Sequence, residues 1–107
     1  NGRFYNERLD GVPGLTVLEN RPDLQSSYWV YTILVEERDE FVRMMAEHGI
    51  TTSQVHARND LHDCVSGYRC PLPNLDVFAK KMVCIPSGWW VTKEDREYIA
   101  DCIRGGW

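Results

Sequence analysis

The clearest pattern in the sequence is an apolar run at residues 28–35, which reads Tyr-Trp-Val-Tyr-Thr-Ile-Leu-Val. The run is rich in β-branched and aromatic residues, and both of its alternating faces are largely apolar, which favours a β-strand. A strand of this kind belongs in the middle of a sheet, covered on both faces. We therefore expect a central strand here. It is the longest apolar stretch of the chain, and it is too short to span a membrane.

Helical spacing of apolar residues predicts three complete helices. The first covers residues 38–48 and ends at Gly49. The second starts from a cap at Asn74, and the third from Thr92, whose spacing from Asp95 is that of a capping box. The residues expected on their inner faces are Phe41, Met44, Met45, Leu75, Phe78, Ala79, Met82, Ile99, Cys102 and Ile103.

Shorter segments complete the expected fold. Residues 1–11 have the spacing of the end of a helix, and residues 12–14, Val-Pro-Gly, predict a turn. Short strands are expected at 15–18, 51–56 and 82–86. This order of helices and strands predicts an α+β fold, a two-layer sandwich in which helices pack on a small, mostly antiparallel sheet.

Length and charge limit the classes of function. A chain of 107 residues fits one domain, residues 1–107, with one modest core. Its net charge is -4 and its basic residues are scattered, which argues against nucleic-acid binding. The N-terminus lacks the apolar segment of a secretory signal, and Cys84 and Cys102 lie in apolar surroundings typical of buried thiols. We therefore expect a cytoplasmic protein that binds neither nucleic acid nor membrane.

Side chains suited to an anionic, oxygen-rich ligand concentrate at residues 54–63. Arg58 offers a planar fork for phosphate or carboxylate, while His56, Asn59 and His62 are able to bond sugar hydroxyls. The alternative is a solvated loop whose Asn and Asp side chains cap the backbone. The residues alone leave both interpretations open.

A zinc site is a weaker alternative for the same region. His56, His62, Cys64 and Cys70 are all possible zinc ligands, but their spacing, H-x5-H-x-C-x5-C, lacks the two-residue knuckle of common structural sites. No P-loop, G-x-G-x-x-G or G-x-S-x-G motif is present in the sequence. We expect no metal ion and no nucleophile from these patterns.

The Trp89-Trp90 pair follows Ser87-Gly88 in a predicted turn. Neighbouring residues in an extended chain point to opposite sides, so at least one indole is expected on the surface. An exposed tryptophan there is a possible contact surface for a partner. The alternative is that one ring fills the core while the other shields a helix end.

Six segments of the chain form a recognisable series: VPG at 12–14, SSYWVYTILVE at 26–36, RDEFVRMMAEHGI at 38–50, SQVHARNDLH at 53–62, LPNLDVFAKKM at 72–82 and IPSGWWVTKEDREYI at 85–99. In order and spacing they resemble the end of full-length sugar aminotransferases of the DegT/DnrJ/StrS family. The resemblance covers essentially the whole chain.

The resemblance implies an origin in a fold type I enzyme that uses pyridoxal phosphate to move an amino group, usually from glutamate, onto a nucleotide-linked keto sugar. In the family, a large N-terminal domain carries the Schiff-base lysine and the Asp that pairs with the pyridine nitrogen. The small C-terminal domain covers the active site and contributes substrate contacts. The resemblance implies such contacts for His56 first, then Arg58 and Asn59, and last His62.

The cofactor-binding part of the family pattern is missing from this chain. Pyridoxal chemistry needs a lysine and a tuning carboxylate, and Lys80, Lys81 and Lys93 match no catalytic position of the family. We therefore expect no catalytic residue and no cofactor in this chain alone. The expected partners are a separate large pyridoxal phosphate domain or a second copy of the chain, with a nucleotide sugar as ligand. The alternative is a free-standing sugar-nucleotide-binding or protein-interaction module.

Overall fold

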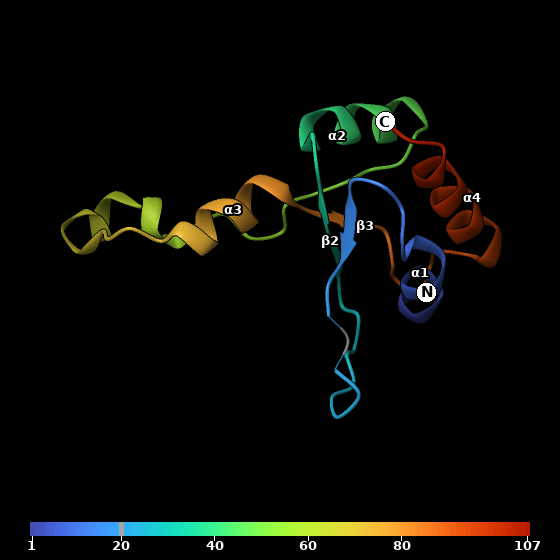
Figure 1. The fold of residues 1–107 in the computed structure, drawn as a ribbon, viewed down its shortest axis with the longest axis horizontal. Coiled ribbons are helices and arrows are strands. Elements are labelled where there is room, and N and C mark those ends of the chain that lie inside the picture. The colour runs from blue at the N-terminus through green and yellow to red at the C-terminus, as the bar shows by residue number, and fades with distance from the viewer. Residues whose placement is uncertain (20) are drawn as a thin grey trace.

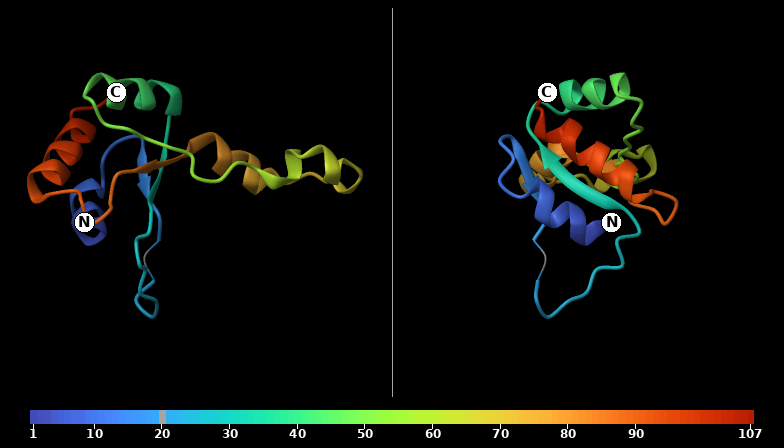
Figure 2. Two further views of the ribbon diagram at one scale, coloured as in Figure 1. Left: turned by 180° about the vertical axis from the view of Figure 1, so that it is seen from behind. Right: turned by 90° about the vertical axis from the view of Figure 1, so that its right-hand side faces the viewer.

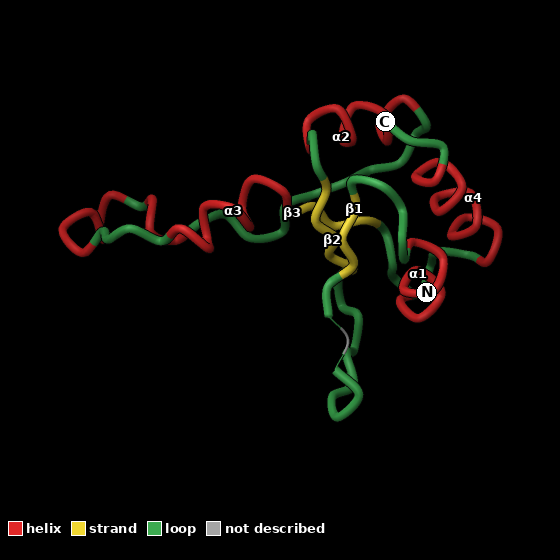
Figure 3. The backbone as a smooth tube through the Cα atoms, viewed as in Figure 1, coloured by secondary structure: helices red, strands yellow, loops and turns green. Residues whose placement is uncertain are grey.

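The computed structural model describes residues 1–19 and 21–107 (Figure 1). At its centre lies an antiparallel sheet of strands β1 (Leu15–Val17), β2 (Tyr31–Val35) and β3 (Met82–Ile85), in the spatial order β1-β2-β3. Figure 3 shows the three strands together, in yellow, at the middle of the molecule. The predicted α+β fold with an antiparallel sheet is confirmed.

Helices lie on both sides of this sheet. They are α1 (Gly2–Leu9), α2 (Arg38–Glu47), α3 (Pro73–Lys81) and α4 (Lys93–Arg104), together with the short 3₁₀ helices η1 (Asn59–Leu61) and η2 (Asp63–Tyr68). Helices α1 and α4 lie on one side of the sheet, and α3 extends from the other side (Figure 2). Within the described ranges, no helix is long and apolar enough to cross a membrane.

Strand β2 is the central strand, as its sequence predicts. Tyr31 pairs with Ile85, and Ile33 pairs with Val83 on one neighbour and with Val17 on the other. The strand begins at Tyr31 and not at residue 28, because Tyr28 adopts a left-handed backbone conformation (φ 49°) that does not continue a ladder.

The two faces of β2 are not equally covered. Tyr31, Ile33 and Val35 are buried, whereas Thr32 and Leu34 on the other face are only half-buried. The prediction that both faces of the strand are covered is therefore wrong for this chain, since helices α1, α2 and α4 pack against one face only.

The core forms between that buried face and helices α1, α2 and α4. Ring pairs join the layers: Tyr5 lies 5.0 Å from Tyr31, and Phe41 meets Trp107 edge-to-face at 5.0 Å between ring centroids. The Trp107 indole N–H donates to the Glu36 carbonyl at 2.9 Å. The buried members include Tyr5, Leu9, Ile33, Val35, Phe41, Met45, Val83, Ile85, Ile99, Ala100 and Ile103.

The helix ends of α2 and α4 match the sequence. Gly49 has φ +72°, which favours glycine, and its N–H donates to the Ala46 carbonyl at 2.9 Å. Thr92 and Asp95 exchange both bonds of a capping box, at 3.0 and 3.1 Å. Local sequence chemistry therefore sets the limits of these two helices.

Helix α3 differs from its prediction. It starts at Pro73 after Leu72, so Asn74 is not its cap; proline suits the first helical position, where no N–H is needed. No residue of α3 is buried, and Leu75, Phe78 and Ala79 are half-buried. The predicted inward residue Met82 is buried, but it belongs to β3.

The strand predicted at 51–56 is reduced to one bridge. Ser53 exchanges two backbone bonds with Cys84, at 2.7 and 3.1 Å, on the free edge of β3. The chain leaves the sheet after this contact, and residues 54–57 are exposed.

The sheet and helices α1, α2 and α4 form the part of the molecule that we call the body, and two segments project from it. The first, which we call the arm (residues 55–81), carries η1, η2 and α3 and extends far from the sheet in Figure 1. The second is the 21–30 loop at the bottom of the same view. They explain a Cα radius of gyration of 15.2 Å, above the ~13 Å of a compact domain of about 100 residues.

The buried tyrosines of the core make the free energy of unfolding depend on pH in the alkaline range. Burial raises the pKa of Tyr5 to about 12 and raises that of Tyr31 as well. Both phenols are retained as donors, to the Pro86 carbonyl at 2.9 Å and to Asn6 Oδ1 at 2.7 Å. The folded chain therefore holds these protons more tightly than the unfolded chain, whose tyrosines titrate near pH 10.

We expect the free energy of unfolding to lose this contribution as the pH rises from about 10 to about 12, and to keep it below about pH 10. Urea unfolding followed by circular dichroism at several alkaline pH values measures the effect. The double variant Tyr5→Phe, Tyr31→Phe should show a clearly smaller slope. Equal slopes for variant and parent would contradict the assignment.

Candidate functional site

The four residues predicted to contact substrate all lie at the start of the arm. His56, Asn59 and His62 are exposed, and Arg58 is half-buried. Asn59 opens η1, and His62 lies between η1 and η2. Among the described residues, no side-chain hydrogen bond joins any two of the four. The fold therefore gathers them on one segment without joining them into a preformed cluster.

Arg58 is held by two carboxylates. Its Nε and Nη2 donate to the two oxygens of Asp60, at 2.9 and 2.6 Å, in the fork geometry of a bidentate pair. Its Nη1 donates to the Asp76 carboxylate on α3. The Arg58 guanidinium holds the pKa of Asp60 below its ordinary value, and the two carboxylates raise the pKa of Arg58. Arg58 thus ties the η1 turn to α3.

Arg69 supports the same turn from the returning part of the arm. Its Nε donates to the Asp60 carbonyl at 2.9 Å, and its Nη2 donates to the Leu61 carbonyl at 2.8 Å. No residue from 51 to 81 is buried. The shape of the arm therefore depends on arginine hydrogen bonds and not on an apolar core.

The base of the arm is joined to the body by further polar contacts. Arg38 on α2 donates to the Ala79 carbonyl at 2.8 Å, and Gln54 donates to the same carbonyl at 3.3 Å. Lys81 pairs with Glu36 at 2.6 Å. These contacts orient α3 relative to the sheet.

His56 meets a residue that sequence reasoning did not place in the site. Its ring lies 6.1 Å from that of Trp29, which comes from the 21–30 loop and is 72% exposed. The apolar run at 28–35 assigned Trp29 to the central strand, so no sequence signal indicated a surface position. The structure thus adds an aromatic face to the polar start of the arm.

The Trp89-Trp90 pair also lies on the surface. Trp89 is 92% and Trp90 65% exposed, and the two rings meet edge-to-face at 5.9 Å. The expectation that at least one of them is exposed is confirmed.

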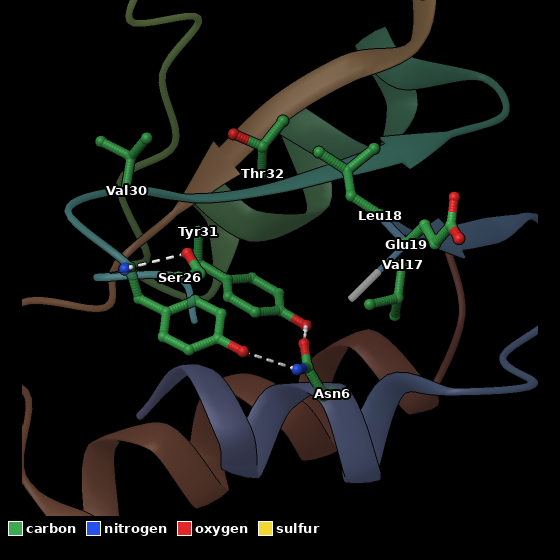
Figure 4. Close-up of a pocket in the computed structure, with 9 residues that line it drawn as sticks. Asn6, Val17, Leu18, Glu19, Ser26, Val30, Tyr31 and Thr32 are labelled. Carbon is green, nitrogen blue, oxygen red and sulfur yellow. Dashed lines mark hydrogen bonds between the residues drawn. The ribbon is translucent and has the colours of Figure 1, made fainter. Parts of the chain in front are cut away.

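A separate hollow of about 200 Å³ lies between α1 and the 21–30 loop (Figure 4). The polar groups in it bond one another: Asn6 donates to the Tyr28 hydroxyl at 2.8 Å and accepts from the Tyr31 hydroxyl at 2.7 Å. The Tyr28 N–H donates to Ser26 Oγ at 3.1 Å. These contacts anchor the loop to α1 and leave few polar groups for a ligand.

The zinc hypothesis gains no support from the geometry. Within residues 1–19 and 21–107, no three His, Cys, Asp or Glu side chains are close enough together to hold a metal ion. Cys64 and Cys70 are exposed free thiols on the arm, and Cys84 is a buried one in β3.

The lysines of the chain do not fit pyridoxal phosphate. Lys80 is exposed on α3, and Lys93 is 68% exposed at the start of α4. Lys81 forms an ion pair with Glu36 at 2.6 Å. A Schiff-base lysine needs a desolvated amine, and none of these three lysines is buried.

The fold and the arm together define a small α+β domain of aminotransferase type. The chain belongs to the DegT/DnrJ/EryC1/StrS aminotransferase family, whose profile matches residues 1–104. The resemblance inferred from the six sequence segments is thereby confirmed.

Solved structures of longer proteins share the fold. AtS13 from Actinomadura melliaura is 45% identical over 100% of this chain and 29% of its own, with a TM-score of 0.96. The sugar aminotransferase CalS13 from Micromonospora echinospora is 40% identical over 99% of this chain and 29% of its own, also at 0.96. DesV from S. venezuelae shares the fold at 24% identity, over 97% and 29%, with a TM-score of 0.89.

The chain therefore spans 29% of the length of these solved structures, which is the share of one small domain. No curated protein matches it.

Loss of the Arg58 contacts should loosen the arm without unfolding the body. We expect Arg58→Gln to accelerate amide hydrogen exchange in η1 and the first turn of α3, while the global free energy of unfolding changes little, because no residue of the arm is buried. Exchange followed by mass spectrometry, with urea unfolding alongside, measures both quantities. We call the contacts of Arg58 with Asp60 and Asp76 the clamp. Because the pKa of Asp60 is held below its ordinary 3.8, the clamp stabilises the arm above that pH. This stabilisation is lost as the pH falls further and Asp60 becomes protonated.

A matched control is Arg21→Gln, which removes an exposed Arg21–Asp23 pair of 2.6 Å in the 21–30 loop. It should leave exchange in the arm unchanged. If Arg58→Gln also leaves the arm unchanged, the clamp is not what holds it.

Proposed function

We propose that this chain is the substrate-side domain of a pyridoxal phosphate-dependent nucleotide-sugar aminotransferase. The observation that carries the proposal is a 40% identity over 99% of this chain to the sugar aminotransferase CalS13, of which the chain spans only 29%. In this role the chain contributes substrate contacts, and a separate cofactor domain supplies the reactive lysine. The chain alone is then not catalytic.

The arm is the proposed substrate-binding element. His56, Asn59 and His62 present exposed donors and acceptors, which suit hydroxyls and phosphate oxygens. Arg58 keeps the segment that carries them in one shape through Asp60 and Asp76. A fixed arm holds these groups in place before the ligand arrives, which reduces the entropy lost on binding.

The proposed protein partner is a large domain that binds pyridoxal phosphate, or a second copy of this chain. Apolar side chains along the arm support a covering partner: Leu61 is 61%, Val77 57% and Tyr68 87% exposed. The proposed compartment is the cytoplasm. A free-standing sugar-nucleotide-binding module is the second candidate, favoured by the closed core of the body.

Binding of a nucleotide sugar to the arm tests the substrate role. With thymidine diphosphate glucose as probe, we expect backbone amide NMR signals of residues 56–62 to shift, and His56→Ala to weaken the apparent affinity about tenfold, the effect of one lost hydrogen bond to a charged group. His48→Ala is the matched control, because His48 is exposed at the far end of α2 and its ring nitrogen bonds the Met44 carbonyl, away from the arm. Equal losses in both variants, or no shift at 56–62, would refute the substrate role.

Mixing the chain with pyridoxal phosphate tests the absence of a catalytic lysine. We expect no specific Schiff-base absorption band, because Lys81 is paired and Lys80 and Lys93 are solvated. The matched variants replace each lysine in turn by arginine. A band that one of these three substitutions abolishes, while the other two leave it intact, would show that the chain holds the cofactor by itself.

A further inference from the structure

A second hollow, of about 380 Å³, opens where the 21–30 loop, the end of β3 and the start of the arm meet. Two exposed indoles, Trp29 and Trp90, line it. Its hydroxyl side chains are those of Thr51, Thr52, Ser53 and Ser87, and its described lining includes no Asp, Glu, Lys or Arg. We call it the tryptophan hollow.

We propose that the tryptophan hollow binds the neutral hexose ring of a nucleotide sugar, an inference that rests on the proposed function. A pyranose presents C–H groups on one face and hydroxyls around its rim. Indole faces carry partial negative charge and pack well against such polarised C–H groups, and threonine and serine hydroxyls match the rim. The lack of Arg and Lys side chains makes the hollow a poor site for the diphosphate, because phosphate groups bind best to cationic side chains.

The size of the hollow supports one ring as its occupant. At about 380 Å³ it lies near the lower end of the ~300–1,000 Å³ of pockets for drug-sized ligands. A complete nucleotide sugar therefore extends beyond it. Since the His56 ring lies 6.1 Å from Trp29, the arm is where the charged remainder of the ligand emerges.

The position of the Trp90 ring depends on Gly88. The indole lies directly over Gly88, so that a Cβ at this position would overlap three of its ring atoms. The backbone of Gly88 does not itself require glycine, because its φ lies outside the left-handed region. Gly88→Ala therefore displaces one wall of the hollow without removing a tryptophan.

Indole N–H signals of the ¹⁵N-labelled chain test the proposal directly. The probes are methyl α-D-glucopyranoside, thymidine diphosphate and thymidine diphosphate glucose. We expect the glucoside and the sugar nucleotide to shift the signals of Trp29 and Trp90 but not that of Trp107, whose indole bonds to Glu36. Trp90→Ala and Gly88→Ala should each weaken binding of the sugar nucleotide about tenfold, the effect of losing one stacked aromatic face.

Two matched controls belong to this test. Tyr98→Ala removes a 51% exposed ring on α4 that does not line the hollow, and Gly67→Ala adds a methyl group where no atom lies within 4 Å. Both should bind like the parent chain. Equal losses in the control and the test variants would overturn the proposal.

The remaining outcomes separate this inference from the proposed function. Shifts at 56–62 without shifts of Trp29 and Trp90 leave the substrate role standing and refute the hexose site. Shifts of these two indoles by thymidine diphosphate but not by the glucoside assign the hollow to the base or the phosphate, and so overturn the proposal. Indole signals that depend on protein concentration without ligand assign it to a second copy of the chain. No shift with any probe refutes both.

Discussion

The structure depends on one constraint, the burial of a single face of a very small sheet. Strands of three, five and four residues expose too little apolar surface to be stable alone, so the sheet needs a covering layer. Tyr31, Ile33 and Val35 supply that face, and α1, α2 and α4 cover it. Because this one layer contains the core, the opposite side of the sheet is free to carry the arm and the surfaces around it.

The chain accordingly has two kinds of stability. In the body, apolar contacts hold together segments that are distant in sequence, as when Phe41 packs on Trp107. In the arm, charged groups close in sequence bond one another, as Arg58 and Asp60 do. The first kind resists solvent and salt, whereas the second is exposed to both and weakens with ionic strength. Both proposed binding surfaces, residues 56–62 and the tryptophan hollow, lie where the apolar body adjoins the polar arm.

Much of the body was predictable from sequence, because its signals are local or periodic. The capping box of Thr92 and the stop at Gly49 are decided within a few residues, and the apolar, β-branched run that includes residues 31–35 marks the central strand. The strand expected at 51–56 was not predictable in its true form, since the edge of β3 accepts only Ser53 before the chain departs. The point at which the chain leaves β3 is set by tertiary contacts, and no pattern in the neighbouring residues marks it.

The candidate site was predictable in its polar part only. His56, Arg58, Asn59 and His62 are visible as a cluster in the sequence, but the partner of Arg58 on α3 is eighteen residues away, and Trp29 reaches His56 from another segment. Trp29 looked like a strand residue because its neighbours are apolar. Its exposure follows from the left-handed turn at Tyr28, which no propensity predicts for tyrosine.

The way the arm is held has a consequence for how such a domain changes over time. Since no side chain from 51 to 81 is buried, substitutions at exposed positions of the arm that do not contact the body leave the packing of the body untouched. Selection is then able to test new hydroxyl, amide or ring groups at its surface while the Arg58 contacts preserve its course. With the arm as the proposed substrate-binding element, binding preference and foldability become separable traits, and the arm is the natural segment to exchange between relatives when a new specificity is sought.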